Sequence, residues 1–243
     1  MRTEPLHYTS GSLACTGTLV IGAEADADSP LILVAPNWLG VTKEAAERAA
    51  RIAGPRGIAL VADMFGGGRT ATGPEDAAPL AGALRDDVNE RRRRIAAALD
   101  ALTAEAGRSG IGNPARRAAI GFCFGGGNVL ELARTGADIA AAICLHGDLV
   151  SPLPAQPGTV KASLLVAHGA RDPVAPKAQR DAFEAEMEEA GATWRMMTFG
   201  RLVHSFCEED ADVPGIAEYD ATGAEATYRL IADFLAETLA LSA

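Results

Sequence analysis

Hydrophobic positions alternate with polar ones in some segments of the chain and form unbroken runs in others. Leu13 to Val20 alternates, which is typical of an antiparallel strand with one exposed face. Leu31 to Pro36 and Ile58 to Asp63 are almost wholly apolar, as expected for strands covered on both faces. Between them, Thr42 to Ile52 has the pattern of a helix, with Thr42 as its N-cap. The beginning of the chain therefore predicts strands that alternate with helices.

The same alternation continues to the end of the chain. Gly66 to Pro79 is rich in glycine and proline and predicts a loop. The later predicted elements are a helix over Asp86 to Ala106, a strand over Ala118 to Phe122, a helix over Asn128 to Arg134, strands over Ile139 to Leu145 and Ser163 to Ala167, a helix over Pro176 to Ala190, a strand over Thr193 to Phe199 and a helix over Ala224 to Leu239. This order predicts an α/β fold: a mostly parallel twisted sheet with helices on both faces. No repeat or linker interrupts it, so residues 1–243 are predicted to form a single domain.

One predicted strand–helix junction carries a reactive side chain at its apex. Residues 121–126 read Gly-Phe-Cys-Phe-Gly-Gly, which is the G-x-S-x-G nucleophile elbow with Cys123 in place of serine. The glycines are expected because the turn is strained and a Cβ at either neighbour would clash. The unpaired N–H groups and the dipole at the start of the helix favour a thiolate. Cys123 is therefore the candidate nucleophile.

A cysteine nucleophile needs a base, and the base needs an acid that orients it. In this arrangement the acid and then the histidine follow the nucleophile along the chain. Asp172 and His204 come in that order, each directly after a predicted strand. Asp172, followed by Pro173, also fits a turn or helix cap, and His204 alone fits a half-buried surface histidine, but their joint placement favours a triad. His168 shares a short loop with Asp172 and is interpreted as structural.

An oxyanion hole needs two main-chain N–H groups. Phe124, the residue after the nucleophile, is one candidate donor. Trp38, in the loop after the strand that ends at Pro36, is the other, and its side chain also fits a pocket wall. Further candidates for lining the pocket or supporting the nucleophile are Asn37, Phe206 and His146.

Composition narrows the choice of partners. The formal net charge is −10, which argues against nucleic acid and against an anionic membrane. The basic run Arg91 to Arg94 lies within a helical pattern and is interpreted as a solvated helix face. No apolar segment has the length of a membrane span or the form of a signal peptide, and the four cysteines form no C-x-x-C pair. We therefore expect a cytoplasmic protein with free thiols and a small-molecule substrate.

These motifs together resemble the dienelactone hydrolase (carboxymethylenebutenolidase-like) family. The resemblance runs from about Leu31 to Leu235, and it rests on the Cys123 elbow, on Val61-Ala62-Asp63-Met64-Phe65-Gly66, on His168-Gly169-x-x-Asp172-Pro173-x-x-Pro176 and on His204-Ser205-Phe206. It implies an α/β-hydrolase fold and a triad of Cys123, His204 and Asp172. The type members hydrolyse dienelactone, so the resemblance implies cleavage of an ester or lactone through an acyl-thioester, with neither metal nor organic cofactor.

Two departures from the family bear on the substrate. Asn37 stands where well-studied members carry a glutamate that takes up the proton of the cysteine, and an asparagine cannot accept that proton. The run Cys207-Glu208-Glu209-Asp210 stands where those members have an arginine that binds the carboxylate of the lactone. An acidic run there would repel an anionic substrate, with Arg69 or Arg85 as candidates for a compensating cation. A neutral ester or lactone is therefore at least as good a candidate as dienelactone.

The sequence fits other classes of function less well or leaves them open as alternatives. A non-catalytic ligand-binding or regulatory protein on a hydrolase scaffold would fit Asn37 and the acidic run. A dinucleotide site is disfavoured, because the second glycine of G-x-G-x-x-G would fall on Cys123, whose side chain would block the pyrophosphate. A zinc site of Cys123, His204 and Asp172 lacks any closely spaced pair of ligands. The sequence leaves the role of Cys207 and the oligomeric state open.

Overall fold

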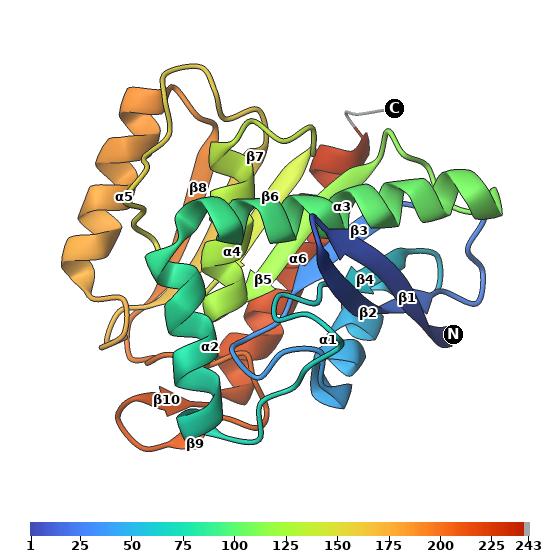
Figure 1. The fold of residues 1–243 in the computed structure, drawn as a ribbon. Coiled ribbons are helices and arrows are strands. Elements are labelled where there is room, and N and C mark those ends of the chain that lie inside the picture. The colour runs from blue at the N-terminus through green and yellow to red at the C-terminus, as the bar shows by residue number, and fades with distance from the viewer. Residues whose placement is uncertain (241–243) are drawn as a thin grey trace.

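The core of the protein is one eight-stranded sheet, which the computed structural model describes within residues 1–240 (Figure 1). The last three residues of the predicted domain lie outside this described part. The strands are β1 (Arg2–Ser10), β2 (Leu13–Ile21), β3 (Leu31–Ala35), β4 (Ile58–Val61), β5 (Arg117–Phe122), β6 (Ala141–Leu145), β7 (Ser163–Gly169) and β8 (Trp194–Phe199), and a separate hairpin pairs β9 (Asp212–Val213) with β10 (Ala217–Glu218). Their order is β1-β2-β4-β3-β5-β6-β7-β8, antiparallel between β1, β2 and β4 and parallel from β4 to β8. The predicted mostly parallel sheet is confirmed.

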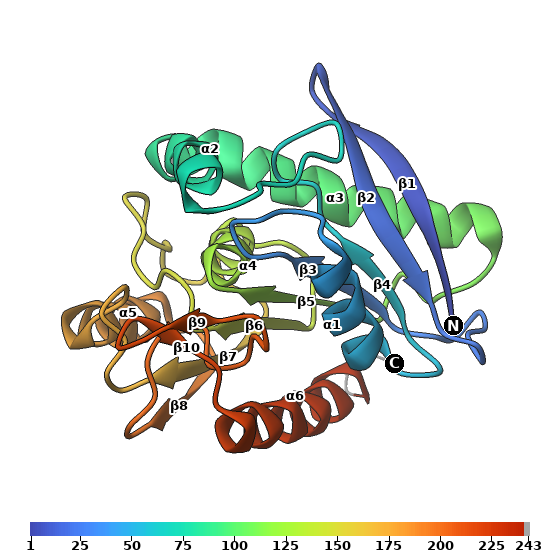
Figure 2. The same cartoon turned by 90° about the horizontal axis from the view of Figure 1, so that it is seen from below.

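Helices cover both faces of this sheet (Figure 2). They are α1 (Lys43–Ala53), α2 (Pro74–Asp86), α3 (Val88–Ser109), α4 (Phe124–Arg134), α5 (Lys177–Ala190) and α6 (Ala221–Ala240). On one face, Ala49 of α1 and Phe234 of α6 belong to one buried apolar cluster. On the other face, α3, α4 and α5 contribute to a second cluster that includes Leu102, Val129 and Phe183. The sheet is therefore the middle layer of three, as predicted.

The amino-acid pattern explains the central elements directly. Every residue of β3 and β4 is buried, because both faces of these strands are covered by helices. Thr42 caps α1 as predicted: its side chain accepts a hydrogen bond from the N–H of Ala45. Asp87 caps α3 in the same way through the N–H of Glu90.

Several elements differ from the predictions, and the hairpin of β9 and β10 was not predicted at all. The strand β1 was not predicted, because its polar residues pair along the exposed edge of β2 and leave only a weak alternation. The predicted loop over Gly66 to Pro79 is wrong from Pro74 onward, where α2 begins: proline at the first helical position needs no hydrogen-bond acceptor. The helix α4 begins at Phe124 rather than at Asn128, since the glycines after Cys123 are already helical.

The predicted solvated face over Arg91 to Arg94 is wrong for most of the run. Arg91 is buried and bonds to α4. Arg92 forms an ion pair with the buried Glu131, and Arg94 bonds to Glu90 and to the carbonyl oxygen of Met64. Arg93 is the most exposed of the four. The basic run is thus mainly an internal set of contacts between helices.

Some features relevant to function are absent from residues 1–240. No helix there is both long and apolar enough to cross a bilayer. In the same residues no group of three or more histidine, cysteine and acidic side chains is arranged to hold a metal ion. The four cysteines are free thiols, and Cys207 is buried between α1 and α6 rather than exposed to the cleft described below.

Candidate active site

Cys123 lies at a sharp turn between β5 and α4, with φ 52° and ψ −120°. Its N–H donates to the carbonyl oxygen of Leu145 at 3.0 Å, which ties the turn to β6. A Cβ on Gly121 would lie 2.1 Å from the carbonyl oxygen of Gly125, and a Cβ on Gly125 would lie 2.1 Å from that of Ala35. The interpretation that these glycines are required by close contacts is confirmed.

The three residues predicted to form a triad lie in one hydrogen-bonded chain. His204 Nε2 is 3.0 Å from Cys123 Sγ, and His204 Nδ1 is 2.8 Å from Asp172 Oδ2. The other oxygen of Asp172 accepts the N–H groups of Val174 and Ala175. Asp172 therefore does what both of its interpretations expected: it caps a turn with one oxygen and holds the histidine with the other.

The charges within this chain stabilise a protonated imidazole. Burial lowers the pKa of His204, but the charge on Cys123 and the hydrogen bond with Asp172 outweigh burial and raise that pKa to about 10. Burial also raises the pKa of Asp172, but its hydrogen bond with His204 outweighs this, and the pKa of Asp172 is lowered overall. The arrangement therefore suits a thiolate–imidazolium pair oriented by a carboxylate.

The two predicted oxyanion donors come from α4 and from the loop after β3. Phe124 is the first residue of α4, where a main-chain N–H has no partner within the helix. Trp38 lies in the turn that follows β3, where Asn37 Oδ1 accepts the N–H of Leu39 at 2.9 Å and the Asn37 carbonyl oxygen accepts that of Gly40 at 3.1 Å. Both Asn37 and Trp38 line the same cleft as Cys123.

This cleft has a volume of about 230 Å³. Its walls come from the loop after β3, the start of α2, the His204 loop and the hairpin of β9 and β10, which Figure 1 shows beside the start of α2. Three of its lining residues are acidic, namely Glu208, Asp210 and Asp212, and none of the lining residues is a lysine or arginine. Arg69 and Arg85 are paired with Asp76 and Asp148 outside the lining. In the described residues, the cleft thus lacks the cation that an anionic substrate would need.

The remaining predicted site residues lie behind the cleft rather than in it. His146 is fully buried, with its Nδ1 3.2 Å from the N–H of Cys123 and its ring edge-on to that of His204. Burial lowers the pKa of His146 well below its ordinary value, so the ring is neutral and Nδ1 accepts. Phe206 is also fully buried and packs on His146. His168 bonds to the carbonyl oxygen of Ala175 in the Asp172 loop, as its structural interpretation expected.

Glu208 is a site residue whose contacts were not predicted from the sequence. Its carboxylate is buried against the cleft and contacts Asn37, Ser205 and Arg48. Burial raises the pKa of Glu208, and Arg48 and Asn37 only partly offset this. No pattern in the sequence distinguishes the buried Glu208 from the exposed acids Glu209 and Asp210 that follow it, so the sequence held no signal for it.

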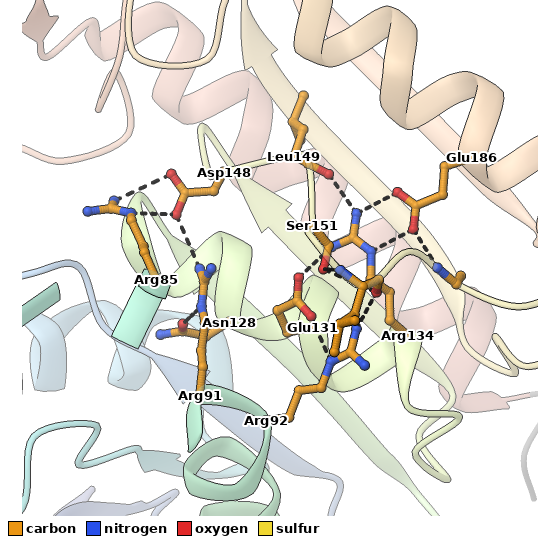
Figure 3. A network of polar contacts seen from close by, with 12 residues as sticks. Arg85, Arg91, Arg92, Asn128, Glu131, Arg134, Asp148, Leu149, Ser151 and Glu186 are labelled. Atoms are coloured by element: carbon orange, nitrogen blue, oxygen red, sulfur yellow. Dashed lines mark hydrogen bonds and ion pairs between the residues drawn. The ribbon is translucent and has the colours of Figure 1, made fainter. Parts of the chain in front are cut away.

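Polar contacts fix the helix that carries the nucleophile turn (Figure 3). At its start, Arg91 of α3 donates to Asn128 and to the carbonyl oxygen of Phe124, and it also pairs with Asp148 at 3.2 Å. At its end, Arg134 pairs with Glu186 of α5 at 2.7 Å. Both ends of α4 are thus held by groups on neighbouring elements.

Comparison with known proteins places this geometry in a family. A sequence profile of the dienelactone hydrolase family matches residues 17–239. A crystal structure described as a dienelactone hydrolase-like promiscuous phosphotriesterase from metagenomic libraries has a TM-score of 0.90 at 33% identity, with 98% of each chain covered. Dienelactone hydrolase from Anabaena variabilis has a TM-score of 0.70 at 19% identity, again with 98% of each chain covered. An uncharacterized protein of Caenorhabditis elegans is 34% identical over 127 residues, which are 50% of this chain and 80% of that protein.

The sheet, its helices and these structural relatives define an α/β-hydrolase fold. Within that class, the chain belongs to the dienelactone hydrolase family. The resemblance inferred from the sequence is therefore confirmed, and membership implies a hydrolase that acts on a small molecule.

Proposed function

We propose that this protein hydrolyses uncharged carboxylic esters or lactones with a triad of Cys123, His204 and Asp172. The observation that carries the proposal is the hydrogen-bonded chain from Cys123 Sγ through His204 to Asp172, with Cys123 facing a cleft of substrate size. No metal or organic cofactor takes part in the proposed reaction.

The proposed reaction has two steps. The Cys123 thiolate attacks the carbonyl carbon, and the oxyanion accepts hydrogen bonds from the main-chain N–H groups of Phe124 and Trp38. When the C–O bond breaks, His204 gives its proton to the leaving alkoxide, and an acyl-thioester remains on the cysteine. The neutral His204 then takes a proton from water as the water attacks the thioester, and the thiolate leaves beside the restored imidazolium. Asp172 keeps the imidazole ring in place throughout.

The charge of the cleft supports an uncharged substrate. Glu208, Asp210 and Asp212 line it, and Arg48, which pairs with the first two, is the cation closest to them in the described contacts. A carboxylate on the substrate would add a further negative charge, which the paired Arg85 and Arg69 are not placed to neutralise. Phosphotriesters are also uncharged, and the relative at 33% identity is described as a promiscuous phosphotriesterase, so they belong in the substrate panel.

Replacement of the sulfur tests the proposal directly. Cys123→Ala should lower kcat for short-chain p-nitrophenyl esters by at least about 10⁴-fold, because the covalent step is lost. The measurement is steady-state hydrolysis, with circular dichroism to show that the fold is intact. Among substrates, neutral esters should be preferred to anionic lactones of the same size. Turnover by the folded alanine variant at the wild-type rate would refute the proposed nucleophile.

A ligand-binding protein on the same scaffold is the alternative. It predicts that Cys123 is no more reactive than an ordinary thiol, whereas the proposed enzyme predicts fast labelling by iodoacetamide and a burst of p-nitrophenol equal to the concentration of sites. Slow labelling together with no burst would favour the binding protein.

A further inference from the structure

A buried carboxylate lies beside the candidate nucleophile, and the proposed reaction does not use it. Glu208 is 2% exposed and lines the cleft with Cys123. Burying an ionised carboxylate is costly unless donors surround it, so its partners are informative. Ser205 Oγ donates to Glu208 Oε1 at 3.0 Å, Arg48 Nη1 is 3.4 Å from Oε2, and the amide nitrogen of Asn37 donates to Oε2. The carboxylate thus joins α1, the loop after β3 and the loop that carries His204.

The contact with Asn37 bears on one oxyanion donor. The amide group of Asn37 donates to Glu208 from its nitrogen and accepts the N–H of Leu39 with its oxygen. It cannot rotate without losing both bonds. Trp38 lies between Asn37 and Leu39, so the anchored amide also fixes the peptide group that contains the Trp38 N–H.

The contact with Ser205 links Glu208 to the residue that follows His204. Ser205 follows His204 directly and has φ 55°, a left-handed conformation that needs support in a residue other than glycine. Its hydroxyl is held by Glu208. One carboxylate therefore contacts two loops that line the cleft together with Cys123.

We propose that Glu208 is a positioning residue for the oxyanion hole. Glu208 orients the Trp38 N–H through Asn37 and supports the His204 loop through Ser205. This inference rests on the proposed function, because it assigns a role within the same site. The size of the effect of Glu208 on kcat depends on the oxyanion donor that Glu208 positions. Loss of one oxyanion donor lowers kcat by about 10²–10³ in other hydrolases, and misalignment of a donor lowers kcat by less. A negative charge near a developing oxyanion opposes catalysis, so the benefit must come from the hydrogen bond rather than from the charge.

The test separates the hydrogen bond from the charge. Glu208→Gln keeps a carbonyl oxygen for Asn37 and an amide that can donate to Ser205, whereas Glu208→Ala removes both contacts. We expect Glu208→Ala to lower kcat for p-nitrophenyl acetate by about 10- to 100-fold, and Glu208→Gln to stay within about threefold of the wild type. Equal losses in the two variants would overturn the proposal, because they would show that the charge is what matters.

A second readout distinguishes positioning from a general structural role. Alkylation by iodoacetamide needs the Cys123 thiolate, which forms an S–C bond as the C–I bond breaks, but it develops no oxyanion. The rate constant for alkylation should therefore change less than about threefold in Glu208→Ala, although kcat falls. Wild-type kcat in this variant, or alkylation that falls as much as kcat does, would contradict the proposal.

Three further variants keep the inference testable if Glu208→Ala fails to fold. Asn37→Ala breaks the same hydrogen bond from the other side and leaves Glu208 with Arg48 and Ser205, so it should reproduce the selective loss of kcat. The double variant should be no slower than Glu208→Ala alone, since Glu208→Ala already removes the contact with Asn37; multiplicative losses would overturn the inference. Glu105→Ala, which removes a mostly buried acid paired with Arg108 within α3 and away from the cleft, is the matched control and should leave kcat unchanged.

The outcome also separates this inference from the proposed function. If Cys123→Ala retains turnover, the proposed function fails. If turnover depends on Cys123 but Glu208→Ala and Asn37→Ala keep the wild-type kcat, the role of Glu208 fails and the triad stands.

Discussion

At the scale of single residues, the position of Cys123 is enforced by main-chain contacts around it. The helix α4 approaches β3 and β5 so closely that Gly125 faces the carbonyl oxygen of Ala35 and Gly121 faces that of Gly125. Rigid carbonyl groups, unlike the ends of flexible side chains, cannot move away from an added methyl group. The shape of the turn therefore depends on these two glycines as much as on the cysteine.

Alanine at Gly125 tests this dependence. A Cβ only 2.1 Å from Ala35 O must push α4 away from β3, so Gly125→Ala should destabilise the protein by about 3 kcal/mol or more and lower esterase activity. Gly82 lies inside α2 with no atom within 4 Å of the equivalent Cβ, so Gly82→Ala should instead stabilise by about 0.5–1 kcal/mol. Urea unfolding of both variants measures the contrast, and similar free energies of unfolding would show that the close approach is unimportant.

At the scale of elements, buried ion pairs hold the nucleophile helix against its neighbours. Burial lowers the pKa of Arg91, and Asp148 offsets only part of that effect. The Arg91 guanidinium also donates to Asn128 (Figure 3). It donates to the carbonyl oxygen of Phe124 at the start of α4 as well. A cation this well buried stabilises the arrangement only while its acid remains in place.

Removal of that acid should therefore be costly. Asp148→Ala leaves Arg91 buried without its carboxylate, and we expect a loss of about 3 kcal/mol in the free energy of unfolding. As a control, Glu237→Ala breaks an exposed pair with Arg195 and should leave the melting temperature unchanged. Calorimetry measures the melting temperatures of the two variants. Equally small decreases in melting temperature would mean that Arg91 bonds to water or to another acceptor once Asp148 is gone.

The sequence predicted the elements where one physical signal dominated. Continuous apolar runs marked β3 and β4, and the elbow motif marked the junction of β5 and α4. Predictions from the sequence were wrong where two signals conflicted. The proline and glycine residues around Pro74 indicated a loop, although proline also occurs at the start of helices. The charge of Arg91 indicated exposure to solvent, although an arginine that is paired can be buried. The local sequence pattern indicates the conformation and exposure that a residue prefers by itself, whereas the structure at Pro74 and Arg91 depends on tertiary contacts.

The candidate site was predictable to the extent that topology dictates it. The ends of parallel strands meet at one edge of a sheet, so the chain order of Cys123, Asp172 and His204 was enough to predict that they meet. The environment of Glu208 was not predictable, because Asn37 lies 171 residues away and the two meet only through the loops between strands. Contacts between loops depend on loop conformation, for which the sequence carries no periodic signal.

At the scale of the whole molecule, folding brings together the three side chains of the candidate site. Cys123 lies 81 residues before His204, and Asp172 lies 32 residues before it, so the unfolded chain separates all three. The hairpin of β9 and β10 adds to this assembly: the N–H of His204 donates to the carbonyl oxygen of Ile216, and the N–H of Glu218 donates to that of His204. The imidazole is therefore held by contacts from several distant parts of the chain.

This assembly should make stability depend on pH in the alkaline range. The pKa of His204 is about 10 in the folded protein and about 6.5 in an unfolded chain, so between these values the folded state keeps a proton that the unfolded state has released. The stabilisation from His204 is complete below about pH 6.5 and is lost as pH rises towards 10.

His204→Gln isolates this contribution. The difference between wild-type and variant free energies of unfolding, measured in urea at several pH values from 6 to 10, should shrink steadily as pH rises, because the variant has no proton to lose at this position. A constant difference for His204→Gln would mean that the imidazole is neutral in the folded protein; the resting enzyme would then hold a thiol, and the thiolate would have to form when substrate binds.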